Sequence, residues 1–181
     1  MMSNPKANIN TWFPKESSTL SAEEIVDSVC SSIYEPENAA AREDVLKSPG
    51  FLREIMLLID LDTELTMNGI LGFLENSSGR YLLETIQALQ HIGAAEDAEI
   101  LEQIYQQLEI TPAQRIKSPG LHEVSSFQDR YILNAEVLDG ILRLSEALYL
   151  NTPDRNIFDN LVGYLSANRH LLDEELKKYS W

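Results

Sequence analysis

The sequence predicts an all-α fold: a single compact domain of about eight to nine helices. Apolar residues recur three and four positions apart along most of the chain, and helix-capping residues stand before these runs. No segment shows the two-residue alternation of a β-strand. We expect residues 1–20 to form a loose N-terminal arm, with Trp12 and Phe13 either docked or free, and residues 21–181 to form the helical domain.

Caps and prolines mark the first helices. Ser21 and Glu24 form a capping box, and Pro36 ends the helix that this box starts. Ser48–Pro49 supplies an N-cap and a favoured first residue for a later helix.

The second half of the chain carries two further caps. Thr111–Pro112 is expected to start one or two helical turns, and Thr152–Pro153 caps a longer helix. Residues 117–125 form the longest predicted loop, and a helical break is expected near Asn134. The helices are expected over residues 22–35, 37–47, 51–59, 62–75, 80–92, 96–108, 126–150, 153–168 and 171–179.

The helix expected over residues 62–75, which Asp60 or Asp62 would cap, is apolar on most of its sides. Such a helix is buried centrally. Gly69 and Gly72 lie three positions apart on one face, and each costs about 1 kcal/mol of helix stability against alanine. We therefore expect a neighbouring helix or loop to pack closely against both glycines in the interior.

Composition indicates a soluble, cytoplasmic protein. Cys30 is the single cysteine, so no internal disulfide framework is predicted, and it lies on an apolar helix face as a small core thiol. The first 15 residues lack the apolar core of a signal peptide, and no apolar run is long enough to span a bilayer.

The net charge of −15 is concentrated in the first 110 residues. Residues 21–66 carry 3 basic and 11 acidic side chains, and residues 67–110 carry 1 and 7. Such a field repels nucleic acids and membranes and attracts basic partners over a Debye length of roughly 8–10 Å. A solvated acidic surface that only maintains solubility is the simpler reading of the same charge.

The motifs support no catalytic or metal-binding chemistry. His91, His122 and His170 are isolated, without the spacing of a zinc site. The acidic triplet in residues 60–64 lacks the glycine and distant glutamate of a calcium loop, and residues 77–79 are not preceded by a strand as in a nucleophile elbow. We predict no catalytic, cofactor-binding or metal site, and no enzyme.

The helix that runs from Glu96 has two distinct faces. At about 100° per residue, one face is apolar and holds Leu101, Ile104, Tyr105 and Leu108. The opposite face is acidic and holds Glu96, Glu99, Glu102 and Glu109. Carboxylates three or four positions apart stand about 5–6 Å from one another, a spacing of the same order as that of phosphates along a DNA strand. A row of them can present a phosphate-like line of charge to a protein that grips DNA.

Residues of the central segment match a known family motif. They are Glu64, Gly69, Phe73, Asn76, Ser77, Ser78, Gly79, Glu84, Ala88, Leu89, Ile92, Gly93, Ala94 and Ile100. Over about residues 60–105 the chain resembles the DNA-mimic protein family of small, acidic, all-helical bacterial proteins. The family's Asn-Gly-Gly triplet appears here as Met67-Asn68-Gly69, and Gly72 replaces an expected Gln. We expect the signature residues Glu64, Gly69, Gly72, Asn76, Gly79 and Gly93 to serve packing and turns.

The resemblance implies a protein that imitates duplex DNA and occupies the DNA-binding face of a basic protein, such as a transcription regulator or a nucleoid-type protein. It also implies a possible homodimer. The carboxylates chosen as phosphate surrogates are Glu35, Glu37, Glu43, Asp44, Glu96, Asp97, Glu99 and Glu102. Two alternatives remain open: an immunity or antitoxin-type inhibitor of a basic nuclease or other toxin, and a generic helical interaction module.

Overall fold

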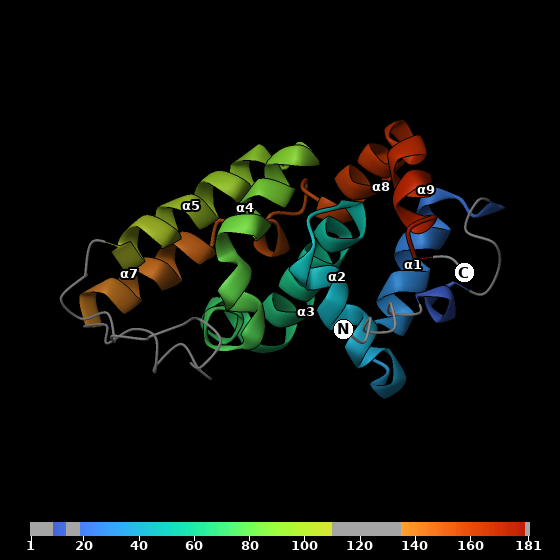
Figure 1. The fold of residues 1–181 in the computed structure, drawn as a ribbon. Helices are drawn as coiled ribbons and strands as arrows, with labels where there is room; N and C mark the ends of the chain where they lie inside the picture. The colour runs from blue at the N-terminus through green and yellow to red at the C-terminus, as the bar shows by residue number, and fades with distance from the viewer. Residues whose placement is uncertain (1–8, 14–18, 110–134, 180–181) are drawn as a thin grey trace. The chain divides into compact units, whose positions relative to one another are not determined.

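The computed structural model describes residues 9–13, 19–109 and 135–179, and all their regular structure is helical (Figure 1). The predicted all-α class is therefore confirmed. The α-helices are α1 (Ala22–Ser32), α2 (Ala39–Lys47), α3 (Phe51–Glu75), α4 (Leu82–His91), α5 (Ala95–Glu109), α7 (Ala135–Ser145), α8 (Ile157–Ala167) and α9 (Arg169–Leu176). Short 3-10 helices are η1 (Asn10–Trp12), η3 (Pro36–Asn38), η4 (Ser77–Tyr81) and η6 (Tyr149–Asn151). The predictions for residues 111–134 lie outside the described residues.

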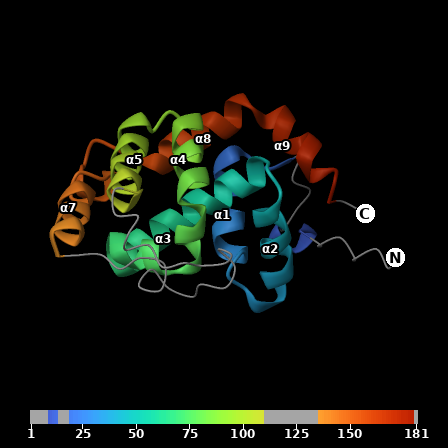
Figure 2. The same ribbon diagram turned by 60° about the vertical axis from the view of Figure 1, so that its left-hand side comes forward.

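Figure 2 shows the helices of the ribbon from a second side. Contacts between residues divide the chain into two compact units. Unit 1 comprises residues 1–56 and 158–181, and unit 2 comprises residues 57–157. The first six residues of α3 therefore belong to unit 1 and the rest of the helix to unit 2.

Helix α1 begins as its sequence predicts. The backbone N–H of Glu24 donates to Ser21 Oγ at 3.2 Å, and the Ser21 N–H donates to Glu24 Oε2 at 2.7 Å. Both bonds of the capping box are present, so two N–H groups that the helix leaves without a partner are satisfied locally.

The N-terminal segment around Trp12 is docked in unit 1. Ile9 and Trp12 are buried, with 1% and 0% of their surfaces exposed. Asn38 fixes the segment, because it accepts a hydrogen bond from Thr11 Oγ1 at 2.7 Å and donates to the Ser32 carbonyl at 2.8 Å. Ser32 Oγ in turn donates to the carbonyl of Trp12. Of the two alternatives for Trp12, the docked one is correct, so this part of the expected arm belongs to the core.

The cap of α3 comes from a distant residue and not from Ser48. Ser48 has an extended backbone and follows the end of α2. The N–H groups of Phe51 and Leu52 instead donate to Glu175 Oε2, at 2.5 and 3.3 Å. A Cβ on Gly50 would lie only 2.6 Å from the Glu175 carboxyl carbon, so the glycine makes room for this cap. The predicted local cap was wrong, because the buried carboxylate of Glu175 in α9 accepts hydrogen bonds from the first N–H groups of α3.

Helix α3 continues through Asp60 and Asp62, where a new helix was expected to start. Asp60 is buried within it, at 3% exposure. The break lies instead at Gly69, with φ 68° and ψ −173°, a region that essentially only glycine occupies. The predicted interior packing of Gly69 is wrong, since the residue is exposed and an added Cβ would meet nothing within 4 Å.

Gly72 is half-buried, and the space for a side chain at this position is limited by a residue of the same helix. An added Cβ would overlap the Cβ of Asn68 and lie 3.2 Å from the Asn68 Cγ. The overlap arises because the break at Gly69 brings Asn68 back toward Gly72. The close approach predicted here is therefore present, but it comes from within α3 and not from a neighbouring element.

The Glu64 carboxylate holds the connection between α3 and α4 in unit 2. Its Oε2 accepts from Asn68 Nδ2 at 3.0 Å and from Asn76 Nδ2 at 2.7 Å, and its Oε1 accepts from Ser78 Oγ at 3.5 Å. A Cβ on Gly79 would lie 2.6–2.8 Å from backbone atoms at the end of α3, which only glycine avoids. Glu64, Asn76, Ser78 and Gly79 therefore build this turn.

Gly93 ends α4 in a Schellman motif. It has φ 81°, its N–H donates to the Gln90 carbonyl at 3.1 Å, and the Ala94 N–H donates to the Leu89 carbonyl at 2.9 Å. These two bonds satisfy carbonyl groups that the helix end leaves open, and α5 starts at Ala95, two residues after the glycine. The predicted helix break is confirmed.

Replacing Gly69 with alanine should lower the free energy of unfolding by about 1–3 kcal/mol, through backbone strain at positive φ and not through overpacking. Gly163→Ala in α8 is the matched control. Gly163 is exposed, has no positive φ and has open space around it, so alanine there should stabilise by about 0.5–1 kcal/mol. Urea denaturation measures both, and equal effects of the two variants would contradict the assignment.

Burial raises the pKa of Glu175 above 4.5, although the Leu52 and Phe51 N–H groups and Lys178 oppose the shift. A raised pKa in the folded state means that the folded protein binds the proton more tightly than the unfolded chain. Compared with the non-titrating Glu175→Gln variant, the wild type should lose stability as pH rises from about 4.5 through the raised pKa. Denaturation of both proteins across this pH range measures the difference, and a difference that does not vary with pH would contradict it.

Candidate partner-binding surface

Helix α5 presents the acidic face that its periodicity predicts. Its buried apolar residues are Ala98, Leu101, Ile104 and Leu108, and the helix contacts α4 on one side and α7 on another (Figure 1). Glu96, Glu99 and Glu102 are exposed on the remaining face. Glu99 and Glu102 are exposed, and no ion pair of either is found within residues 9–13, 19–109 and 135–179.

The density of charge on this face can be compared with that of DNA. The first and last of the three carboxylates lie six positions apart, which is about 9 Å of helix at a rise of 1.5 Å per residue. Duplex DNA carries one charge per about 1.7 Å of its axis, and each strand one per about 3.4 Å. The α5 face, at about one charge per 4.5 Å, approaches the phosphate row of one strand and not that of the whole duplex.

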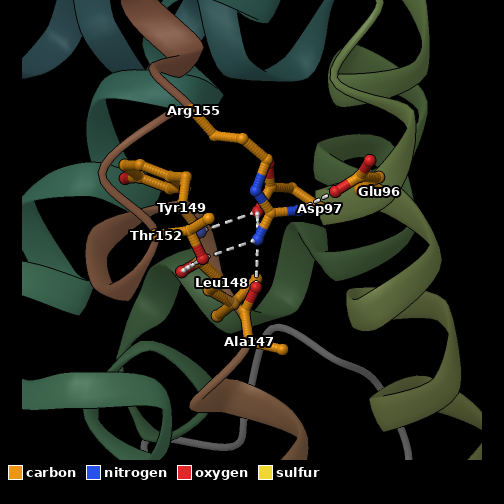
Figure 3. A network of polar contacts seen from close by, with 7 residues as sticks. All are labelled: Glu96, Asp97, Ala147, Leu148, Tyr149, Thr152 and Arg155. Atoms are coloured by element: carbon orange, nitrogen blue, oxygen red, sulfur yellow. Dashed lines mark hydrogen bonds and ion pairs between the residues drawn. The ribbon is translucent and has the colours of Figure 1, made fainter.

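Asp97 is not a surface carboxylate. It is 2% exposed, and its Oδ1 accepts the Tyr149 N–H at 2.8 Å and lies 3.6 Å from Arg155 Nη2 (Figure 3). Burial raises the pKa of Asp97, while the Tyr149 bond and the Arg155 charge act in the opposite direction. The prediction of Asp97 as a phosphate surrogate was wrong, since its side chain anchors the segment after α7 to the start of α5.

Arg155 covers the N-terminal end of the acidic face. Its Nη1 donates to Glu96 Oε2 at 2.8 Å, and its Nη2 donates to Thr152 Oγ1 at 3.1 Å and to the Ala147 carbonyl (Figure 3). The Glu96 side chain is 79% exposed and that of Arg155 only 20%. Glu96 therefore faces solvent with a cation beside it that offsets its charge, whereas no described basic residue forms an ion pair with Glu99 or Glu102. Arg155 was missed, because it lies 59 residues away and no local pattern marks it.

Tyr149 links this network to α3. Its hydroxyl donates to Asp62 Oδ1 at 2.7 Å, while its backbone N–H bonds Asp97. Burial, the bond to Asp62 and the charges of Asp62 and Asp97 raise the pKa of Tyr149 far above its ordinary value of 10.0, so the phenol stays a donor. Asp62, expected as a helix cap, instead anchors this tyrosine.

The other four predicted surrogates, Glu35, Glu37, Glu43 and Asp44, are exposed in unit 1 around η3 and α2. Glu43 makes an exposed ion pair with Lys47 at 3.3 Å. The eight chosen carboxylates thus fall into two groups of four in different units. By sequence, unit 2 carries 16 acidic and 6 basic residues, and unit 1 carries 13 and 8. Unit 2 therefore carries −10 of the total charge of −15 and unit 1 carries −5.

The groups considered for catalysis or metal binding are dispersed. His91 and His170 are exposed on different helices, and His122 lies outside the described residues. Within the described ranges, no three His, Cys, Asp or Glu side chains are grouped to hold a metal ion. Cys30 is half-buried and not part of a disulfide. Over the same ranges, no helix is both long and apolar enough to cross a bilayer.

A pocket of about 460 Å³ lies in unit 1. Its lining is of mixed charge: Asp44, Lys47, Ser48, Pro49, Glu175, Lys178 and Tyr179. The most buried polar group there, Glu175, is already engaged in capping α3. The lining therefore does not favour one class of ligand.

The comparison with known proteins gives one result. A family model described as DMP19-like protein matches residues 47–168, which is 122 of the 181 residues. This range covers the Glu64 turn, the Schellman motif and the whole of α5. No curated protein and no solved structure matches the chain.

Removing the Asp97 carboxylate should destabilise the fold, whereas neutralising Glu99 should not. Asp97→Ala leaves the buried Tyr149 N–H without its acceptor and removes a carboxylate 3.6 Å from Arg155, which costs about 1–3 kcal/mol. Glu99→Gln changes an exposed position and should stay within about 0.5 kcal/mol. Thermal or urea denaturation separates the two variants, and an Asp97→Ala protein as stable as Glu99→Gln would overturn the anchoring role.

Proposed function

We propose that this chain, which belongs to the DMP19-like family, is a non-enzymatic protein that imitates DNA and occupies the DNA-binding face of a basic protein. Its partner would be a transcription regulator or a nucleoid-type protein. This is the function implied by the DNA-mimic motif in residues 60–105, and the family match covers that whole segment.

The observation that carries the proposal is the row of exposed carboxylates on α5. Glu99 and Glu102 stand about one turn apart on a helix whose other faces are packed, so their backbone positions are fixed before a partner arrives. A preorganised helix loses little backbone freedom on binding, which favours affinity. The −10 charge of unit 2 adds long-range attraction for a basic surface.

The arrangement also divides the chosen residues by role. Glu99 and Glu102 are the strongest surrogates, Glu96 is offset by Arg155, and Asp97 is excluded because it is buried. Glu35, Glu37, Glu43 and Asp44 form a second exposed group in unit 1, which we propose as a secondary contact surface.

The experiment starts with capture of partners from native cell extract at low and high salt. Glu99→Lys combined with Glu102→Lys should abolish most partner binding while leaving the fold intact, because both positions are exposed. The matched control is Glu23→Lys combined with Asp27→Lys, which makes the same change in net charge on exposed positions of α1. Equal losses in the two double variants would indicate net charge and not an α5 surface.

Competition then tests mimicry itself. In a polarisation assay with the captured partner, the wild type should displace DNA in a concentration-dependent way, because two ligands of one surface exclude each other. Wild-type binding should also weaken steeply with salt. A stable complex of this protein, its partner and DNA would leave only an interaction module. Capture and inhibition of a nuclease would favour the immunity alternative.

A further inference from the structure

The chain contains one Asn-Gly pair, Asn68–Gly69, and the fold places it on the surface of unit 2. Both residues are exposed, as is Met67 before them, at 74%. The space around Gly69 is open, since an added Cβ there would meet nothing within 4 Å. Solvent therefore reaches this peptide bond and the side chain before it.

We propose that Asn68 is a site of spontaneous deamidation that converts the amide into an acid. The backbone nitrogen of Gly69 loses its proton to solvent base and attacks Cγ of Asn68. A carbon–nitrogen bond closes a five-membered succinimide, and the side-chain nitrogen leaves as ammonia. Water then opens the ring at either carbonyl, which gives aspartate or isoaspartate. Water is the only co-reactant, and no oxidation or reduction occurs.

Two features of the structure favour the reaction at this position. Glycine has no side chain to hinder the attack of its nitrogen. The backbone at Gly69 also leaves the helical region, so the peptide is not held within a continuous helix on both sides. Asn76 is a built-in comparison, because its amide donates to the same Glu64 oxygen but a serine follows it.

The turn around Glu64 uses both residues of this pair. The conformation at residue 69 is one that glycine adopts and other residues avoid. At position 68 an amide is needed, because it donates to Glu64 Oε2 at 3.0 Å. Replacing Asn68 with a residue that has no amide loses the bond to Glu64, and replacing Gly69 introduces backbone strain. The same two residues that build the turn therefore form the reactive pair.

The product would weaken the turn around Glu64. A carboxylate at position 68 cannot donate to Glu64 and stands four residues from it on the same helix, where like charges repel. Each conversion also adds one negative charge to the already acidic unit 2.

The test uses the full-length protein, incubated at neutral and mildly alkaline pH and sampled over time. Trypsin cleaves after Arg53 and Arg80, so a single peptide contains both asparagines, and fragmentation in the mass spectrometer locates the change. We expect acid to accumulate at position 68, as aspartate and isoaspartate, faster at the higher pH. Asn76 should keep its amide many times longer. The Asn68→Gln variant should show no such change.

Two outcomes would overturn the proposal. One is an intact Asn68 over a time in which a synthetic peptide of residues 64–74 converts, since the fold would then protect it. The other is conversion of Asn76 at the same rate. The effect on the turn is read from Asn68→Asp, which should lower the melting temperature in the wild type and less so in a Glu64→Gln background. Equal melting temperatures of Asn68→Asp and wild type would remove the predicted weakening.

Discussion

The carboxylate of Glu64 is the interaction on which the arrangement of unit 2 depends. It accepts hydrogen bonds from Asn68, Asn76 and Ser78, and so joins the broken end of α3 to the turn that follows. The break at Gly69 lets the chain return toward the carboxylate. The turn then leads into α4, whose Schellman end at Gly93 starts α5. The direction of the acidic face of α5 within unit 2 follows from this sequence of turns.

A chain with 29 acidic residues uses its carboxylates in physically different ways. Glu64 and Glu175 take backbone or side-chain donors at turns and helix ends, and Asp97 anchors a buried segment. Glu99 and Glu102 face solvent. Net charge alone therefore overstates the charge available to a partner, because the anchored carboxylates are shielded by their donors or by burial.

The anchored carboxylates nevertheless support the helix that carries the exposed ones. A helix held in place loses little backbone freedom when a ligand binds to it. Asp97 and Arg155 tie the segment after α7 to the first turn of α5, and α4 and α7 pack on its apolar faces. The charged face thus stands on a supported helix and not on a loop.

The sequence by itself determined the helical class, the capping box of α1, the end of α4 at Gly93 and the two-faced character of α5. Each of these features depends on residues that lie within about one or two helical turns of one another. Their spacing along the sequence is therefore enough to predict the feature. The family signature likewise marked the turn around Glu64. Helix α3 is buried on all sides near Asp60. In such a helix the local pattern does not distinguish a helix-capping residue from a core residue, so the predicted helix break was misplaced.

The tertiary structure decided which carboxylates stay exposed and which are parts of the fold. Glu175 caps a helix that begins 124 residues earlier, and Arg155 reaches α5 from 59 residues away. The tertiary structure also shows that position 69 needs glycine for its backbone conformation and not for close packing. Helical periodicity tells on which face a residue lies, but burial and partnership depend on which distant segment covers that face, and only the folded chain specifies that segment.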